Sequence, residues 1–381
     1  MPSGDPLDPP VNPLFVSERR TTPLDINQGD ELPTVLVDTG DAMAMRYFSS
    51  PIVDEDPSDP FRTAGFGGPR TGWNYGGTTN GQLEISPHGG VHMGVGGWMS
   101  AFATAARDPI FWLHHANIDR LWEAWLALGD PDDPSNRDFR NPRGRRAARW
   151  LNMWFKVGGG ASAVTLRVRE VLDTRQPPLN YFYSNISVPA PAPAAVLAAS
   201  PATDSGFAEE EESVPEDISP EMVGASARVP LAAEPTEIEF AIEAPSGPAL
   251  RERGEGVQPR RVYLKVENVR GTEPAAASYL VYVNLPPEAD PTTDPTTDLT
   301  PYEDRRVGQI TMFGVPEASE ADEEHSGSGL AFTYDMTRIF QRLRDAGEWD
   351  AERLRVVFTP ELVDATQAGD VSVGQVSLFY A

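Results

Sequence analysis

The chain has 381 residues, with 31 Lys and Arg against 57 Asp and Glu, which gives a formal charge of −26. A surface this acidic repels phosphate, so we expect neither nucleic acid nor anionic lipid as a partner. The absence of cysteine excludes disulfides, thiolate metal sites and thiol nucleophiles. No apolar run reaches the roughly 20 residues of a membrane helix, and the first residues lack the pattern of a signal peptide. We therefore expect a soluble chain, and the sequence does not assign its localisation.

Residues 1–80 are rich in Pro, Gly and Asp and predict loops, whereas 83–130 is the best-organised stretch. Asp108-Pro109 predicts an N-cap followed by a proline at the first helical position. Gly129 and Pro131 then predict the end of this helix. Between them, spacings of four, three, four and three mark the inward stripe of an amphipathic helix: Phe111, His115, Ile118, Trp122 and Trp125.

The rest of the chain predicts strands, a linker and a second folded unit. Residues 150–188 alternate in strand fashion, whereas the acidic, Ala/Pro-rich stretch 189–235 predicts a disordered or extended linker. Residues 236–381 read as short strands between turns, with one helix from Met336 to Ala346, which is typical of an antiparallel β-sandwich. The expected fold is therefore α+β multidomain: a helical unit over 1–188, a linker over 189–235 and a sandwich over 236–381.

Four of the five histidines fall within 28 positions. His88 and His92 are four residues apart, so on a helix both imidazoles project from one face. His115 adds a third imidazole from the inward stripe of the next helix, with His114 beside it. A site of nitrogen ligands suits copper or zinc and is poor for calcium or magnesium. Because no carboxylate or thiolate obviously joins the set, a coordination position stays open for chemistry.

The residues around these histidines resemble a known family. PHGGVHMGVGGWM and ARDPIFWLHHANIDRLWEAW are similar to the second copper-binding half, called CuB, of the type-3 copper proteins: tyrosinases, catechol oxidases and haemocyanins. The resemblance implies an α-helical copper bundle, represented by its second half, and assigns His88, His92 and His115 as the ligands of this copper.

The similarity is greatest to the plant-type polyphenol oxidases and extends over most of the chain. WLNMWFKVGGGASAVTLRVREVLDT resembles the segment after their copper bundle, and Tyr181-Phe182-Tyr183 resembles their Tyr-x-Tyr motif. The strands VYLKVENV, SYLVYVNLP, VGQITMFGVP and VSVGQVSLFY resemble, in order, those of their C-terminal domain. That domain shields the active site until it is removed, so the resemblance implies a latent enzyme.

The family needs a first copper, CuA, held by three further histidines, but no histidine precedes His88 and His325 lies far away in sequence. The first twenty residues resemble the stretch that follows the CuA region, so we expect Met1 to fall where the middle of a longer family member would be. A separate chain that carries CuA is the alternative.

Three further positions near the histidines match the family's pattern or depart from it. Glu84 matches a glutamate that holds a water, and Phe102 matches a gate phenylalanine stacked over the copper site. An ordinary solvated carboxylate and plain core packing are their alternatives. Gly89 stands where members that hydroxylate monophenols often have Asn, which favours diphenol oxidation.

Two groups outside the ligand set also carry expectations. Asp119 is placed to accept a hydrogen bond from a ligand ring, or to pair with Arg120. The tryptophans in this stretch are most simply core residues: Trp98, Trp112, Trp122 and Trp125.

The function that the resemblance implies is copper-dependent oxidation of o-diphenols, with monophenols as a further possibility, to o-quinones by O2. The partners are then a phenolic substrate and O2. We expect these 381 residues alone to bind at most one copper and to lack oxidase activity, because CuA is absent. Two alternatives stay open: a non-catalytic or O2-carrying copper protein, and a mononuclear three-histidine zinc enzyme.

Overall fold

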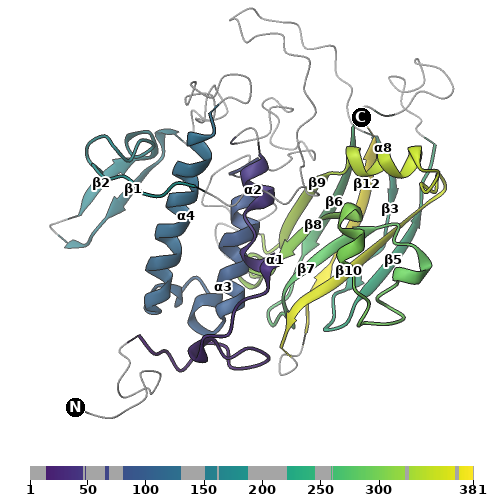
Figure 1. Cartoon of the computed structure of the whole chain (residues 1–381), viewed down its shortest axis with the longest axis horizontal. Helices are drawn as coiled ribbons and strands as arrows, with labels where there is room; N and C mark the ends of the chain where they lie inside the picture. The colour runs from purple at the N-terminus through teal and green to yellow at the C-terminus, as the bar shows by residue number, and fades with distance from the viewer. Residues whose placement is uncertain are drawn as a thin grey trace, which may run out of the picture.

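The computed structural model describes residues 14–45, 48, 65–67, 80–129, 151–160, 163–187, 221–244, 259, 261–321, 326–364 and 369–380. A helical unit and a sheet unit lie side by side, with α1, α2 and α3 between the long helix α4 and the strands (Figure 1). The expected loop over 131–149, most of the expected linker and His325 fall outside the described residues. In the described part, no helix is long and apolar enough to cross a bilayer.

The helical unit is built from one long helix and several short segments. The helices are α1 (Thr34–Val37), α2 (Gly40–Ala44), α3 (Gly90–Val95) and α4 (Pro109–Ala127). A π-helical segment, η2 (Glu84–Gly89), leads directly into α3. The 3-10 segments are η1 (Ile26–Gln28), η3 (Gly97–Ser100), η4 (Ala105–Arg107) and η7 (Val168–Glu170). An antiparallel two-stranded ribbon of β1 (Trp154–Val157) and β2 (Val164–Arg167) follows, within the stretch 150–188 whose alternation predicts strands.

The sheet unit is a sandwich of two four-stranded antiparallel sheets. One has the order β5-β10-β7-β8, from β5 (Thr236–Ala241), β10 (Arg353–Val363), β7 (Ala276–Val283) and β8 (Arg306–Thr311). The other has the order β3-β12-β6-β9, from β3 (Glu221–Ala225), β12 (Gln375–Tyr380), β6 (Val262–Val269) and β9 (Leu330–Asp335). The short strands β4 (Val229–Pro230) and β11 (Ser372–Val373) pair beside them. The helical segments of this unit are η8 (Pro287–Ala289), η9 (Thr300–Arg305), α7 (Val315–Ser319) and α8 (Thr337–Asp345), the last within one residue of expectation at each end.

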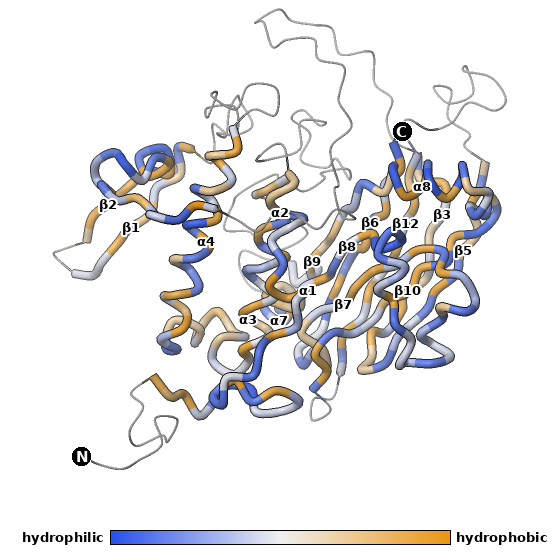
Figure 2. The backbone as a smooth tube through the Cα atoms, in the orientation of Figure 1, coloured by the Kyte–Doolittle hydropathy of each residue, from blue (hydrophilic) through white to orange (hydrophobic). Residues whose placement is uncertain are grey.

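The core of the sandwich forms where alternate residues of the two sheets face each other. Leu264 and Val266 of β6 and Val281 of β7 are fully buried in one cluster with residues of β9, β10 and β12. Hydrophobic residues colour much of these strands (Figure 2). Every residue of β7 is buried, because Leu280 and Tyr282 on its other face pack in a second cluster that includes Val35 of α1. The helical unit therefore covers part of the outer face of this sheet.

The sheet unit begins earlier than its expected start at residue 236. β3 pairs with β12 and β4 pairs with β11, so residues 221–230 belong to the sandwich although the sequence places them in the linker. The composition of 189–235 is dominated by Ala, Pro and acids, which hides two short strands whose pairing partners lie about 150 residues later.

The two units share one apolar cluster. Leu36, Ile85 and Met93 of the helical unit belong to the same buried cluster as the sandwich core. An ion pair between Arg306 of β8 and Asp41 of α2, 3.4 Å apart, lies in the same interface. The segment that carries His88 and His92 is thus packed directly against the C-terminal sandwich.

Candidate metal centre

The first two histidines lie on a short helical stretch that close backbone contacts hold in place. η2 runs into α3, so His88 and His92 project together, with ring centroids 4.7 Å apart. The hydroxyl of Ser86 donates to the carbonyl of Asp38, 2.7 Å away, which ties η2 to the end of α1. A Cβ at Gly90 would lie 2.2 Å from the carbonyl oxygen of Leu36, so only glycine permits this approach of α3 to α1.

The third histidine is positioned by the long helix α4, whose start follows the sequence prediction. The Asp108 carboxylate accepts from the amide of Ile110 at 2.9 Å, and Pro109 occupies the first turn. Arg19 donates two further hydrogen bonds to Asp108, at 2.9 and 2.7 Å. Because Asp108 is fully buried, this network fixes where α4 begins and hence where His115 lies.

The three expected ligand nitrogens converge. The Nε2 atom of His115 lies 3.4 Å from that of His88 and 3.3 Å from that of His92. Two nitrogens each 2.0–2.1 Å from one metal ion at a tetrahedral angle lie about 3.3–3.4 Å apart. The spacing therefore fits a single copper or zinc ion bound by all three imidazoles.

The Nδ1 atoms of His88 and His92 are committed to acceptors, which leaves the Nε2 atoms of these two rings for a metal. Nδ1 of His92 donates to the carbonyl of Met99, 2.6 Å away. Nδ1 of His88 donates a hydrogen bond to Oε2 of the Glu84 carboxylate, 2.8 Å away. Such partners fix the tautomer and the ring orientation of metal ligands. The Nε2 atoms of His88 and His92 both face Nε2 of His115, so a metal ion held among the three nitrogens fits this donor set.

Burial keeps the His92 and His115 rings neutral. Desolvation, followed by the field of His88, lowers the pKa of His92 to about 4, and desolvation in the same way lowers the pKa of His115 to about 4. Partial burial acts to raise the pKa of the Glu84 carboxyl, but the nearby imidazoles and the hydrogen bond from His88 outweigh it and lower this pKa. At neutral pH the His92 and His115 imidazoles are therefore unprotonated, and the Glu84 carboxyl beside them is ionised.

His114 lies in the same cluster and also brings a ring nitrogen within 4.8 Å of those of His88 and His92. Its Nε2 donates to the main-chain carbonyl of His88 at 3.2 Å, and burial lowers its pKa to about 3. The 3.3–3.4 Å spacing belongs to His115, however, and a nitrogen that donates to a carbonyl is not free to bind a metal. His114 therefore fits a structural role, and His115 the role of ligand.

An aromatic ring from the sandwich covers the imidazoles, and sequence reasoning missed it. Phe313, between β8 and α7, stacks on His92 with centroids 4.1 Å apart and planes at 14°. It also meets His88 edge-on at 5.5 Å. Phe102, expected to stack over the copper site, packs edge-to-face against Phe313 at 4.7 Å. No local signal marks Phe313, because it lies about 200 residues after the histidines in an ordinary strand-and-turn pattern.

Two other expectations change in the structure. Oδ2 of Asp119 accepts hydrogen bonds from the hydroxyls of Tyr181 and Tyr183, both at 2.6 Å, so this carboxylate ties α4 to the Tyr-x-Tyr segment and is not directed at a ligand ring. Trp125 is core as expected, but Trp112 is 64% exposed and is not a core residue of the described part of the chain.

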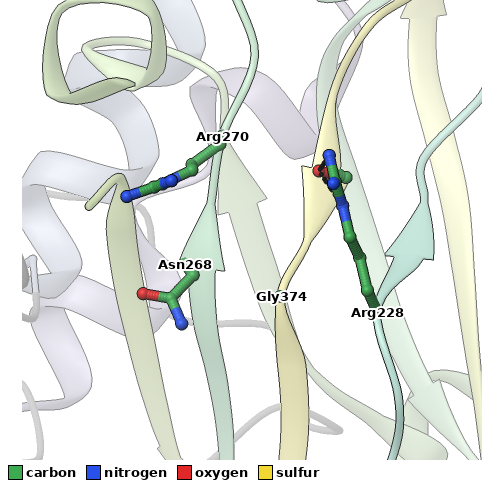
Figure 3. Close-up of a pocket in the computed structure, with 5 residues that line it drawn as sticks. Arg228, Asn268, Arg270 and Gly374 are labelled. Atoms are coloured by element: carbon green, nitrogen blue, oxygen red, sulfur yellow. Dashed lines mark hydrogen bonds between the residues drawn. The ribbon is translucent and has the colours of Figure 1, made fainter. Parts of the chain in front are cut away.

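A cavity of about 300 Å³ lies elsewhere, on the sandwich, and is distinct from the histidine cluster. Its lining includes Arg228, Asn268 and Arg270 (Figure 3). The guanidinium of Arg228 donates to the hydroxyl of Ser372 at 2.8 and 3.1 Å, and Arg270 points away from it. Because these groups do not converge, the cavity has no evident part in the chemistry of the histidines.

Comparison with known proteins agrees with this geometry. Residues 9–128 match the common central domain of tyrosinase, and residues 219–381 match a domain of unknown function, DUF7868. Tyrosinase HcTyr1 from Hahella sp. (strain CCB-MM4) is 30% identical over 319 residues, which cover 82% of this chain and 59% of that protein. Aureusidin synthase from Antirrhinum majus is 33% identical over 118 residues, 29% of this chain and 19% of that protein.

The fold has solved counterparts. The structure of a recombinantly expressed latent aurone synthase (polyphenol oxidase) matches with a TM-score of 0.51 and 17% identity, over 97% of this chain and 66% of that one. The chain thus spans about three fifths of HcTyr1 and two thirds of this structure. Residues 9–128 of the chain therefore match a tyrosinase central domain, and over 82% of its length the chain is similar to a tyrosinase.

Proposed function

We propose that His88, His92 and His115 bind one copper ion, and that the chain serves the oxidation of o-diphenols to o-quinones by O2. The spacing of 3.3 and 3.4 Å between the Nε2 atoms carries this proposal. Copper supplies electron transfer between the phenol and O2. The protein contributes ligand geometry: the carbonyl of Met99 and the carboxylate of Glu84 hold the His92 and His88 rings in the orientation that presents Nε2.

Glu84 and Phe102 have supporting roles in this proposal. The Glu84 carboxylate is 44% exposed and deprotonated, so it can hold a water beside His88 while it accepts from that ring. Phe102 helps to enclose the site through its edge-to-face contact with Phe313. Gly89 offers no side chain to hydrogen-bond a phenol or a water, which supports diphenol over monophenol oxidation.

Coverage of the imidazoles by the sandwich supports a latent state. Phe313 occupies the face of His92 and the edge of His88, where a planar phenol would approach. The relatives and solved structures of this family include latent forms. We propose that removal or displacement of the sandwich uncovers the metal site.

Electron balance limits what one such site can do. Conversion of a diphenol to a quinone removes two electrons and two protons, whereas one copper exchanges one electron. A second copper would need three more imidazoles, and the sequence offers only His114 and His325 beyond the three ligands. We therefore propose that the 381-residue chain binds one copper and does not oxidise catechol by itself.

Metal stoichiometry of the purified chain tests both statements. We expect one Cu(II) per chain by calorimetric titration, loss of binding in His92→Ala and His115→Ala, and retention in the control His325→Ala. Two coppers per chain, steady catechol turnover, or unchanged binding in His115→Ala would contradict the proposal. Zinc retained through purification, with no copper exchange, would favour a zinc protein.

A further inference from the structure

The residue directly after the first proposed ligand is pressed against the C-terminal sandwich. A Cβ at Gly89 would lie 2.5 Å from Oγ1 and 3.1 Å from Cγ2 of Thr311, the last residue of β8. Approaches under 3.0 Å are essentially never made by real Cβ atoms. Even alanine at position 89 therefore collides with Thr311 while the sandwich is seated on the helical unit.

Thr311 cannot easily yield. It is 1% exposed, and its backbone pairs with Ser278 in the ladder between β7 and β8. Its hydroxyl oxygen accepts from the amide of Phe313 at 3.3 Å. A shift of Thr311 away from position 89 therefore also moves Phe313, the ring that stacks on His92.

The same stretch of the sandwich, residues 311–317, contacts the helical unit at a second place. Gly314 has φ +80°, and a Cβ there would meet the ring of Phe102 at 3.0 Å. Oε1 of Glu317 accepts from the main-chain amide of Phe102 at 3.2 Å. We call residues 311–317 the covering segment. Because its contacts are close and partly backbone-based, it fits this surface in one position.

We propose that residue 89 determines whether the covering segment can seat on the metal site: glycine permits it, and any side chain displaces Thr311 and with it Phe313. A residue 89 with a side chain long enough to reach a bound phenol would then prevent the covering segment from seating. The same position would therefore affect both the coverage of the site and the choice of phenol. The significance of covering these imidazoles rests on the proposed function, whereas the steric contact itself needs no metal.

Carbethoxylation of the metal-free full-length chain by diethyl pyrocarbonate, followed by peptide mass spectrometry, tests this proposal without activity or metal. His325 serves as the internal reference for the labelling rate. Overpacking of a close contact costs enough to raise the open population by about tenfold or more. We therefore expect Gly89→Ala to raise the labelling rate of His92, relative to His325, by about tenfold or more.

Two further variants make the result specific. Thr311→Ala removes both colliding atoms, so Gly89→Ala/Thr311→Ala should return His92 to the slow rate of the parent chain. Gly159→Ala, at a glycine with no atom within 4 Å of its Cβ, is the matched control and should leave the rate unchanged. Far-UV circular dichroism checks folding of each variant.

Two outcomes would overturn the proposal. Slow labelling of His92 in Gly89→Ala, equal to the Gly159→Ala control, would show that position 89 tolerates a side chain. Fast labelling or unfolding of Gly89→Ala that Thr311→Ala does not reverse would also overturn it. The collision would then be with the carbonyl of Glu84, which lies 3.0 Å from the same Cβ. A chain that binds no copper could still give the expected labelling pattern, so failure of the proposed function remains distinguishable.

Discussion

Replacement of Phe313 by alanine should uncover the imidazoles while leaving them in place. The ring makes three aromatic contacts across the interface, at 4.1 Å to His92, 5.5 Å to His88 and 4.7 Å to Phe102. Contacts of this kind contribute about 0.5–1.5 kcal/mol each, so the loss of all three weakens coverage by about 1.5–4.5 kcal/mol. At 1.4 kcal/mol per factor of ten, the uncovered population rises about 10- to 1,500-fold.

The apparent affinity of the copper-loaded chain for a catechol measures this population, because affinity scales with the fraction of protein that is competent to bind. We expect 4-nitrocatechol, followed by its absorbance, to bind Phe313→Ala more tightly by about the same factor. Phe340→Ala is the matched control, since Phe340 is equally buried and makes an edge-to-face pair at 4.8 Å, with Trp349 inside the sandwich. An affinity of Phe313→Ala no higher than that of Phe340→Ala would refute the reasoning.

Three further predictions concern stability. Asp108→Ala removes the shared partner of the start of α4 and of the Arg19 guanidinium, so it should lower the free energy of urea unfolding by about 3–5 kcal/mol. A loss below about 1 kcal/mol would contradict the buried network. The unfolded state takes up a proton at His92 below pH 6.5, whereas the folded state does so only near pH 4. Metal-free protein should therefore lose about 1.6 kcal/mol of stability at this residue as the pH falls from 6.5 to 5. An identical pH slope in His92→Gln would argue against this assignment. Arg306→Leu removes the cation between Asp41 and Glu303 and should lower the free energy of unfolding by about 3–5 kcal/mol. Asp41→Asn should lower it by only about 1 kcal/mol, because Arg306 keeps its ion pair with Glu303 at 2.6 Å. Equal losses in the two variants would contradict this order.

The features that the sequence predicts correctly are those written in neighbouring residues. The start of α4 follows from Asp108-Pro109, and the helical turn between His88 and His92 follows from their spacing. The convergence of His115 with this pair needs α4 to pack beside α3, which the apolar stripe and the family resemblance together indicate. Local signals of this kind survive because capping and helical periodicity act within a few residues.

The missed features depend on contacts between distant parts of the chain. Phe313 reaches His92 across more than 200 positions, and nothing in its neighbourhood distinguishes it from a core phenylalanine. β3 forms because β12 offers it an edge, not because residues 221–225 have strong strand propensity. For Asp119, the spacing predicts either a contact with a ligand ring or a pair with Arg120. The carboxylate instead accepts from Tyr181 and Tyr183, in a segment that helical periodicity cannot place. Tertiary pairing decides these cases, so a single sequence does not reveal them.

The shared apolar cluster determines how the molecule comes apart. Leu36, Ile85 and Met93 are buried among sandwich residues, so separating the two units exposes them to water even if each unit keeps its own secondary structure. Each such side chain contributes roughly 1.5–3 kcal/mol when buried. The helical unit and the sandwich are therefore expected to melt as one cooperative block with a single calorimetric peak. A protease cut between them would leave the fragments associated, so uncovering the histidines would require a force or a solvent change in addition to the broken peptide bond.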